Sequence, residues 1–307
     1  MRLFSRVCIH LAATASATRS MLTAKADTLD SDNDQEIRIT APYSILIEAE
    51  SGAVLFEKNA DDLMHPSSMA KLMTAELVFK VILEGRLTLD DAFTISEYAW
   101  RRGGAPSGDS TMYAELHSPV KVNDLLYGMI VCSGNDASIA LAEGMAGTEA
   151  DFAVRLNERA RELGLTKSHF SNSTGFPDAK LRMTSRDLAQ LAQHIIRTYP
   201  EFYPICGAIE FTWNKITQRN RNPLLSMGIG ADGMKTGFTQ QGGYGLVGSA
   251  VQNGTRLIAV VNGLRTAKER SDEARKLLEW GYRTVEARLQ LARAEVSSTD
   301  RVFASPR

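Results

Sequence analysis

The chain has 307 residues, of which 44% are hydrophobic and 23% are charged, and its 35 basic and 36 acidic side chains leave a formal net charge of -1. This composition excludes an intrinsically disordered or collagen-like protein. The near balance of charge lacks the basic excess of a nucleic-acid-binding domain, so DNA and RNA are not expected partners. The length suits one large folding unit or two ordinary ones.

The spacing of cysteines and histidines indicates neither a disulfide framework nor a metal site. Cys8, Cys132 and Cys206 form no paired motif, and no two of the five histidines stand at the close spacing of a zinc site. We therefore expect no metal and no other cofactor. No stretch reaches the roughly 18 apolar residues that a membrane span needs, so no transmembrane helix is expected either.

Residues 1–26 have the pattern of a secretory signal peptide. Two arginines precede a short apolar stretch at residues 7–17, and Ala24 and Ala26 provide small residues before a cleavage point. We predict cleavage after Ala26 and export to the periplasm or cell envelope. A disordered N-terminal extension is the alternative interpretation.

The next part of the chain predicts strands and then helices. Apolar runs at residues 43–47 and 53–56 flank Glu50-Ser51-Gly52, which predicts a β-hairpin. Apolar residues recur at helical spacing from Met69 to Glu84, so we expect a buried helix that ends before Gly85. Further helices are expected at residues 122–131, 136–145, 148–163 and 184–199.

Strand patterns return after Pro223. The strand-like runs lie at residues 231–237, 243–251 and 255–262, and Asn253-Gly254 is a strong hairpin signal between the last two. An amphipathic helix is expected at residues 268–282. Strands near both ends around a helical middle predict a mixed α/β fold, with an antiparallel sheet built from both chain ends, helices on its faces and an inserted helical subdomain.

Three short motifs stand in order along the chain. They are Ser68-Met69-Ala70-Lys71, Ser133-Gly134-Asn135 and Lys235-Thr236-Gly237. Each is weak by itself, because such short patterns occur by chance in many proteins. In combination they predict one site assembled from a helix start, a junction between helices and a strand.

Ser68 and Lys71 stand three residues apart at a helix start, so their side chains share one face. A serine hydroxyl becomes a nucleophile when a base takes its proton, and lysine is a base only in its neutral form. Burial and a nearby cation favour that form, and we expect Lys235 to be the cation. Backbone N–H groups at the helix start would stabilise an oxyanion. The pattern predicts acyl transfer, although a lone helical lysine is more often exposed.

The other two motifs suit the later steps of that chemistry. Ser133 would relay a proton to the leaving group, and the Asn135 amide would hold both Lys71 and a substrate carbonyl. Because both residues precede an apolar helix, simple N-capping is the alternative. Lys235 to Gly237 lie on a predicted strand, and an edge strand there would pair with a peptide while Gly237 allows its close approach.

With these residues the chain resembles the serine D-Ala-D-Ala carboxypeptidases, the low-molecular-mass penicillin-binding proteins of the SxxK acyl-transferase superfamily. The resemblance covers most of the chain and extends beyond the bare motifs. The matching contexts are residues 43–47, 65–74, 133–137, 220–225, 232–239 and 263–266.

The resemblance implies a β-lactamase/transpeptidase-like fold and a two-step reaction on muropeptides that end in D-Ala-D-Ala. Ser68 attacks the terminal peptide bond, D-alanine leaves, and water hydrolyses the acyl-enzyme; β-lactam antibiotics acylate the same serine. It also implies an oxyanion hole formed by the backbone N–H groups of Ser68 and Phe238. The residues at matching groove positions are Thr236, Gly237, Thr239, Arg221 and Arg270. Arg270 is the candidate for the substrate carboxylate, with a surface ion pair as the alternative for either arginine.

Two departures from the family pattern stand out. Phe238 replaces the His or Tyr usual after the third motif, which should tune the rate if only its N–H acts. Residues 27–285 match the serine D,D-peptidase catalytic domain, whereas residues 286–307 form a short tail that resembles at most a remnant or the first strand of a C-terminal β domain. We see no C-terminal membrane anchor in this tail and expect a monomer.

Three other functions use part of the same pattern. A D,D-endopeptidase that cuts peptidoglycan cross-links would need the same residues. A class A β-lactamase would need a glutamate to activate water, and Glu210 is the candidate, although it stands far from Ser133 and on a strand-like run. A non-catalytic penicillin-binding remnant is the third alternative. All five polar motif residues are intact, which argues against it, because a decayed enzyme has no physical reason to keep them.

Overall fold

The structure is a computed structural model that describes residues 37–303 of the chain. The predicted signal peptide at residues 1–26 lies outside the described residues. Among the helices of the described part, none combines the length and the apolar character needed to cross a membrane.

Five antiparallel strands form the main sheet, in the order β2-β1-β9-β8-β7. Their bounds are β1 Tyr43–Glu48, β2 Val54–Lys58, β7 Ala231–Thr239, β8 Gly243–Gln252 and β9 Thr255–Leu264. β1 from the first part of the chain pairs with β9 from the last part, which confirms the predicted sheet built from both ends. β7, which carries the third motif, is an edge strand.

Helices fill the middle of the chain, as the periodicity predicts. They are α2 Lys71–Leu83, α4 Val122–Ile130, α5 Asn135–Ala146, α6 Glu149–Glu162 and α7 Ser185–Thr198. Thr148 and Thr184 cap α6 and α7, because each hydroxyl accepts the backbone N–H three residues ahead. Sequence periodicity missed the short α3 Glu97–Gly103, whose two turns carry too little pattern to detect.

Short elements complete the described chain. Two small hairpins pair β3 Ala92–Thr94 with β4 Pro119–Lys121, and β5 Glu210–Trp213 with β6 Ile216–Arg219. Single 3-10 turns are η1 Ser67–Ala70, η2 Ala105–Ser107, η3 Tyr203–Gly207 and η4 Pro223–Ser226. η1 runs directly into α2 and carries the first motif.

The last helix corrects one expectation. α8 runs Ala267–Phe303, so the residues after 286 continue the helix predicted at 268–282 and do not begin a strand. The stretch 283–303 contains neither Gly nor Pro and is rich in Ala, Arg, Glu and Leu, which are strong helix formers. The strand prediction for this tail was therefore wrong.

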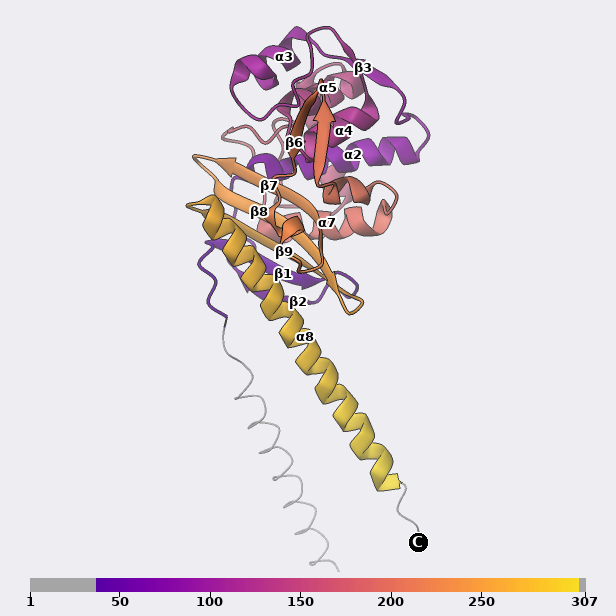
Figure 1. Ribbon diagram of the computed structural model, residues 1–307, viewed down its shortest axis with the longest axis vertical. Helices are drawn as coiled ribbons and strands as arrows, with labels where there is room; N and C mark the ends of the chain where they lie inside the picture. The colour runs from indigo at the N-terminus through magenta and orange to yellow at the C-terminus, as the bar shows by residue number, and fades with distance from the viewer. Residues whose placement is uncertain (1–36, 304–307) are drawn as a thin grey trace, which may run out of the picture. The chain divides into compact units, whose positions relative to one another are not determined.

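Helices cover both faces of the sheet (Figure 1). Successive residues of a strand point to opposite faces. Leu46 of β1 lies under α8, where Gly281 lets the helix approach: an added Cβ would stand 2.4 Å from the Leu46 side chain. Its neighbours Ile45 and Ile47 belong to the main hydrophobic core on the other face, with α2 and α7.

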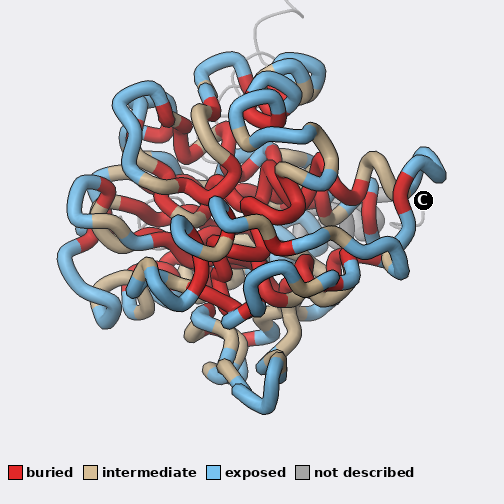
Figure 2. The backbone as a smooth tube through the Cα atoms, turned by 90° about the horizontal axis from the view of Figure 1, so that it is seen from above, coloured by how far each residue is buried: buried red, intermediate tan, exposed pale blue. Residues whose placement is uncertain are grey.

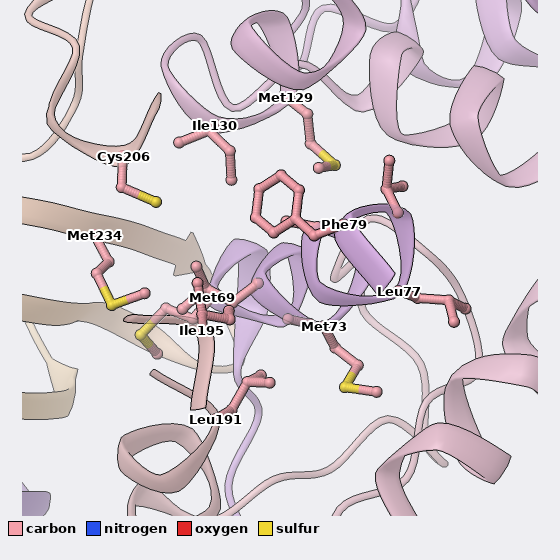
Figure 3. Close-up of a cluster of buried hydrophobic side chains, with 14 of the residues drawn as sticks. Met69, Met73, Leu77, Phe79, Met129, Ile130, Leu191, Ile195, Cys206 and Met234 are labelled. Carbon is pink, nitrogen blue, oxygen red and sulfur yellow. The ribbon is translucent and has the colours of Figure 1, made fainter. Parts of the chain in front are cut away.

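The core lies around α2, which is buried along most of its length. Phe79 of this helix stacks on Phe202 with ring centroids 5.1 Å apart and meets Tyr199 at 5.7 Å. Figure 3 shows side chains from α2, α4, α7 and β7 meeting around Phe79 and Met69. Figure 2 shows buried backbone in the interior and exposed turns around it. Since the first motif is the N-terminal end of α2, the core holds the nucleophile in place.

Candidate active site

Ser68 lies in η1, at the point where β7 passes the start of α2. The preceding Ser67 adopts φ +51°, a left-handed conformation that a non-glycine residue rarely holds without support. That support includes a hydrogen bond of 2.9 Å between the hydroxyls of Ser67 and Thr239. Ser68 itself is only partly buried, unlike its neighbours Ser67 and Met69.

Lys71 is fully buried one helical turn after Ser68. Its Nζ atom donates to three oxygens: Asn135 Oδ1 at 2.7 Å, the Thr174 carbonyl at 2.5 Å and Ser68 Oγ at 3.1 Å. The alternative of an exposed lysine is therefore wrong. The amine stands within hydrogen-bonding reach of the hydroxyl that it would deprotonate.

The surroundings lower the pKa of Lys71 from 10.5 to about 7. Burial is the largest cause, because it disfavours the charged ammonium, and the charge of Arg221 adds to it. Three carboxylates act in the opposite direction, those of Glu149, Asp136 and Asp109. A pKa near neutrality leaves about half of the amine uncharged at about pH 7.

The second motif faces the same place. Ser133 has φ +59°, and its buried hydroxyl accepts a hydrogen bond of 2.8 Å from Lys235 Nζ. Asn135 is the first residue of α5, and its Oδ1 accepts a hydrogen bond from Lys71 Nζ. Gly134 occupies the cap position and no side chain caps the helix, so simple N-capping does not explain these two polar residues.

Lys235 is as buried as Lys71, and its pKa is lowered well below 10.5. Burial is the main cause, followed by the charge of Lys71. We expected Lys235 to supply the charge that keeps Lys71 neutral, but Arg221 is the cation that acts on Lys71 most strongly. A guanidinium stays protonated in proteins, whereas burial disfavours the charged form of the Lys235 amine.

Edge strand β7 presents the third motif beside Ser68. Gly237 packs against the first motif so closely that an added Cβ would stand 2.9 Å from the Pro66 carbonyl oxygen. Thr236 is buried, while Phe238 is 49% exposed and its ring stacks on that of Tyr244 at 4.1 Å between centroids. Thr239 uses its hydroxyl within the protein, because it bonds Ser67 and accepts from Gly242 N.

The two candidate arginines differ in their surroundings. Arg221 is exposed, and its NH1 donates 2.8 Å to the Ser110 hydroxyl. Arg270 is partly buried, with its guanidinium 5.7 Å from the ring centroid of Tyr244. Its Nε is buried and has no hydrogen-bond partner within the described residues, and its charge reaches Lys235. Within the described residues neither arginine forms an ion pair with a carboxylate, so the surface ion-pair alternative is not what the structure shows.

Sequence reasoning missed two supports of the site. The Thr174 carbonyl is a partner of Lys71, but a backbone carbonyl has no residue-type signal. Asp136, next to the second motif, is buried and accepts from Thr111 Oγ1 and from the N–H groups of Met112 and Ala114. Burial raises the pKa of Asp136, although these bonds oppose the rise. The Asp136 carboxyl thereby holds the segment that carries Ser110.

Comparisons with known proteins agree with this geometry. Residues 30–266 match the family model described as D-alanyl-D-alanine carboxypeptidase. The chain belongs to this family. It is 41% identical over 268 residues to the D-alanyl-D-alanine carboxypeptidase DacA of Haemophilus influenzae, an alignment that covers 87% of this chain and 68% of that relative. Membership makes the protein a serine-type D-Ala-D-Ala carboxypeptidase, a hydrolase and a penicillin-binding protein.

Solved structures show the same fold. Penicillin-binding protein 5 from Haemophilus influenzae superposes with a TM-score of 0.78 at 42% identity, over 81% of this chain and 72% of that one. Penicillin-binding protein D2 from Listeria monocytogenes, solved in its ampicillin-bound form, has a TM-score of 0.70 at 30% identity over 81% of this chain and 100% of that one. The β-lactamase alternative is not favoured: Glu210 is exposed on the β5–β6 hairpin, in register with Arg219.

Proposed function

We propose that the five motif residues perform the carboxypeptidase reaction through an acyl-enzyme on Ser68. The Ser68 hydroxyl attacks the carbonyl of the penultimate D-alanine of a peptidoglycan stem peptide while Lys71 takes its proton. The bond to the terminal residue breaks, D-alanine leaves with a proton on its amine, and water then hydrolyses the ester and restores Ser68. The observation that carries this proposal is the buried Lys71 amine, 3.1 Å from Ser68 Oγ and with a pKa of about 7.

The leaving amine needs a proton at its nitrogen. Ser133 is suited to supply it, because Lys235 Nζ already donates to the Ser133 oxygen at 2.8 Å. With that lone pair occupied, the Ser133 O–H is directed away from Lys235 and is available to donate to the leaving nitrogen. Lys235 thereby orients the Ser133 hydroxyl for protonation of the leaving group, and Asn135 orients the Lys71 amine.

Substrate recognition would use the outer edge of β7, the last strand of the sheet. A peptide would add to this edge as a further strand, with Thr236 and Gly237 along it. The backbone N–H groups of Ser68 and Phe238 would form the oxyanion hole. Arg270 would bind the terminal carboxylate, because its guanidinium lies 5.7 Å from the Tyr244 ring centroid and its Nε has no hydrogen-bond partner within the described residues. Arg221 would line the groove from the other side of the site.

The test uses purified muropeptides. Incubation of the protein with a monomeric pentapeptide muropeptide should release free D-alanine and leave a tetrapeptide, and Ser68→Ala should release none. A cross-linked dimer supplied alongside distinguishes the two peptidase activities. Faster loss of the dimer than of the monomeric pentapeptide would contradict the carboxypeptidase assignment and favour an endopeptidase.

We also propose that the protein is exported and works where peptidoglycan lies, in the periplasm or cell envelope. The pattern of residues 1–26 supports this, as does a substrate found outside the cytoplasm. N-terminal sequencing of the protein recovered from cells should start at Asp27. Recovery of an intact Met1 form from the cytoplasm would contradict export.

A further inference from the structure

Residues 171–176 form a polar turn that packs against the first motif. Gly175 adopts φ +85° and lies so close to the backbone of Ser67 that an added Cβ would stand 2.0 Å from the Ser67 carbonyl oxygen. The Asn172 side chain orders the turn from within, since its Oδ1 accepts from Thr174 N at 3.2 Å and Gly175 N at 2.8 Å. The position of this turn therefore decides where the Thr174 carbonyl lies.

Glu149 holds the turn from outside. Its Oε1 accepts from both the N–H (3.0 Å) and the hydroxyl (2.7 Å) of Ser173, while Oε2 accepts from Tyr98 at 3.0 Å. The Ser173 carbonyl is fixed as well, by the hydroxyls of Thr74 at 2.7 Å and Ser138 at 2.8 Å. Every polar backbone atom of Ser173 is thus bound, and the next residue is the one whose carbonyl meets Lys71.

The Thr174 carbonyl matters because of the shape of a neutral amine. Such an amine has two N–H bonds and one lone pair, arranged tetrahedrally. Asn135 Oδ1 at 2.7 Å and the Thr174 carbonyl at 2.5 Å are the nearest acceptors, so they take the two N–H bonds. The lone pair then points to the third neighbour, the Ser68 hydroxyl at 3.1 Å. Loss of either carbonyl would let the amine turn away.

We propose that Glu149 is a positioning residue for acylation: through Ser173 it holds the Thr174 carbonyl that aims the Lys71 lone pair at Ser68. This inference rests on the proposed function of Lys71 as the base. Glu149 touches neither the substrate nor the reacting atoms, and it is the first residue of α6, next to the Thr148 cap.

Glu149 also acts on Lys71 by its charge, which raises the pKa of Lys71 and opposes the effects of burial and Arg221. Asp136 and Asp109 raise the pKa of Lys71 as Glu149 does, and the neighbouring titratable amine is that of Lys235, whose pKa Lys71 lowers. Around Glu149 itself the titratable groups that interact with it are Tyr98 and Glu143, and the charge of Arg102 acts on Tyr98. Two substitutions of Glu149 therefore separate the effect of its charge from the effect of its hydrogen bonds. One removes the charge and keeps an acceptor oxygen, and the other removes both.

The experiment measures the rate of Ser68 acylation by a fluorescent penicillin across pH in the full chain. In Glu149→Gln an amide oxygen still accepts from Ser173, so the plateau rate at high pH should stay within about twofold of wild type. Without the negative charge, the acid limb of the profile should move to lower pH. In Glu149→Ala the plateau should fall roughly 10- to 100-fold, the usual cost of a misplaced catalytic group. Asp151→Asn, in the same exposed first turn of α6, is the matched control and should change neither.

The outcomes decide between the possibilities. A wild-type plateau in Glu149→Ala would overturn the positioning role, and an unmoved acid limb in Glu149→Gln would overturn the charge effect. Should Glu149→Ala fail to fold, as judged by circular dichroism, the plateau of Ser173→Gly decides in its place and should fall. Absence of label on Ser68 in wild type would refute the proposed function instead, whereas labelled wild type with Glu149 variants that match Asp151→Asn would refute this inference alone.

Discussion

Replacement of Arg221 by methionine tests how the base is kept neutral. After burial, the charge of Arg221 is the strongest influence that lowers the pKa of Lys71. Its removal should therefore raise that pKa. Acylation needs the neutral amine, which is present above the pKa, so the acid limb of the acylation profile should move to higher pH.

The size of the effect follows from the position of the pKa. At a pKa of about 7, about half of Lys71 is neutral at about pH 7. A rise of about one unit, equal to about 1.4 kcal/mol, is the upper end for an exposed guanidinium that solvent screens. The neutral fraction would then fall to about one tenth, so acylation at about pH 7 should slow up to about fivefold. At about pH 9 the rates of the variant and wild type should converge.

The assay is the rate of labelling by a fluorescent penicillin from about pH 5 to about pH 9. Arg219→Met is the matched control, because Arg219 is an exposed arginine on β6 and is not among the groups that shift the pKa of Lys71 most. Ser110→Ala separates the charge from the hydrogen bond that Arg221 makes to the Ser110 hydroxyl. An acid limb that stays in place or moves to lower pH in Arg221→Met would refute the reasoning.

Two further substitutions test stability. Arg159→Leu should cost about 3–5 kcal/mol of unfolding free energy, because Arg159 donates to the fully buried Glu76 carboxylate at 2.7 and 2.9 Å. Burial raises the pKa of Glu76, but the hydrogen bonds to its carboxylate outweigh burial, so the pKa lies below 4.5. The stabilisation that the Glu76 carboxylate provides is therefore present above about pH 4.5 and is lost as the pH falls through the lowered pKa. Urea unfolding measures the free energy of unfolding of the Arg159→Leu variant. The control is Arg155→Leu, an exposed position on the same helix, whose stability should lie within about 0.5 kcal/mol of wild type. Phe79→Ala should cost about 3–5 kcal/mol, whereas Leu83→Ala, 56% exposed on the same helix, should cost under about 1 kcal/mol; equal losses would contradict the core described above.

Much of the fold was predictable because it depends on local periodicity. The helices of the middle segment and the Asn253-Gly254 hairpin between β8 and β9 carry signals within a few residues of each other. The end of α8 differs from the predicted strand, because residues 286–295 are an unbroken run of helix formers that continues the preceding helix. The short α3 has two turns and too few apolar positions to show a period.

The candidate site was predictable in its side chains and less so in its environment. Ser68, Lys71, Ser133, Asn135 and Lys235 meet as their motifs indicate, because each chemical role demands a particular residue type. The charge balance was not predictable, since the influence of Arg221 on Lys71 depends on distances that only the fold sets. Glu149 and the Thr174 carbonyl belong to the same class: their importance comes from what they touch.

Intact-mass spectrometry after exposure to penicillin G tests the central claim most directly. The wild-type protein should gain the mass of one penicillin, and peptide mapping should place it on Ser68. Ser68→Ala should gain none while keeping its circular dichroism spectrum, and Lys71→Met should acquire the adduct at least roughly 100-fold more slowly. An adduct of equal yield on Ser68→Ala, or none on folded wild type, would contradict the account.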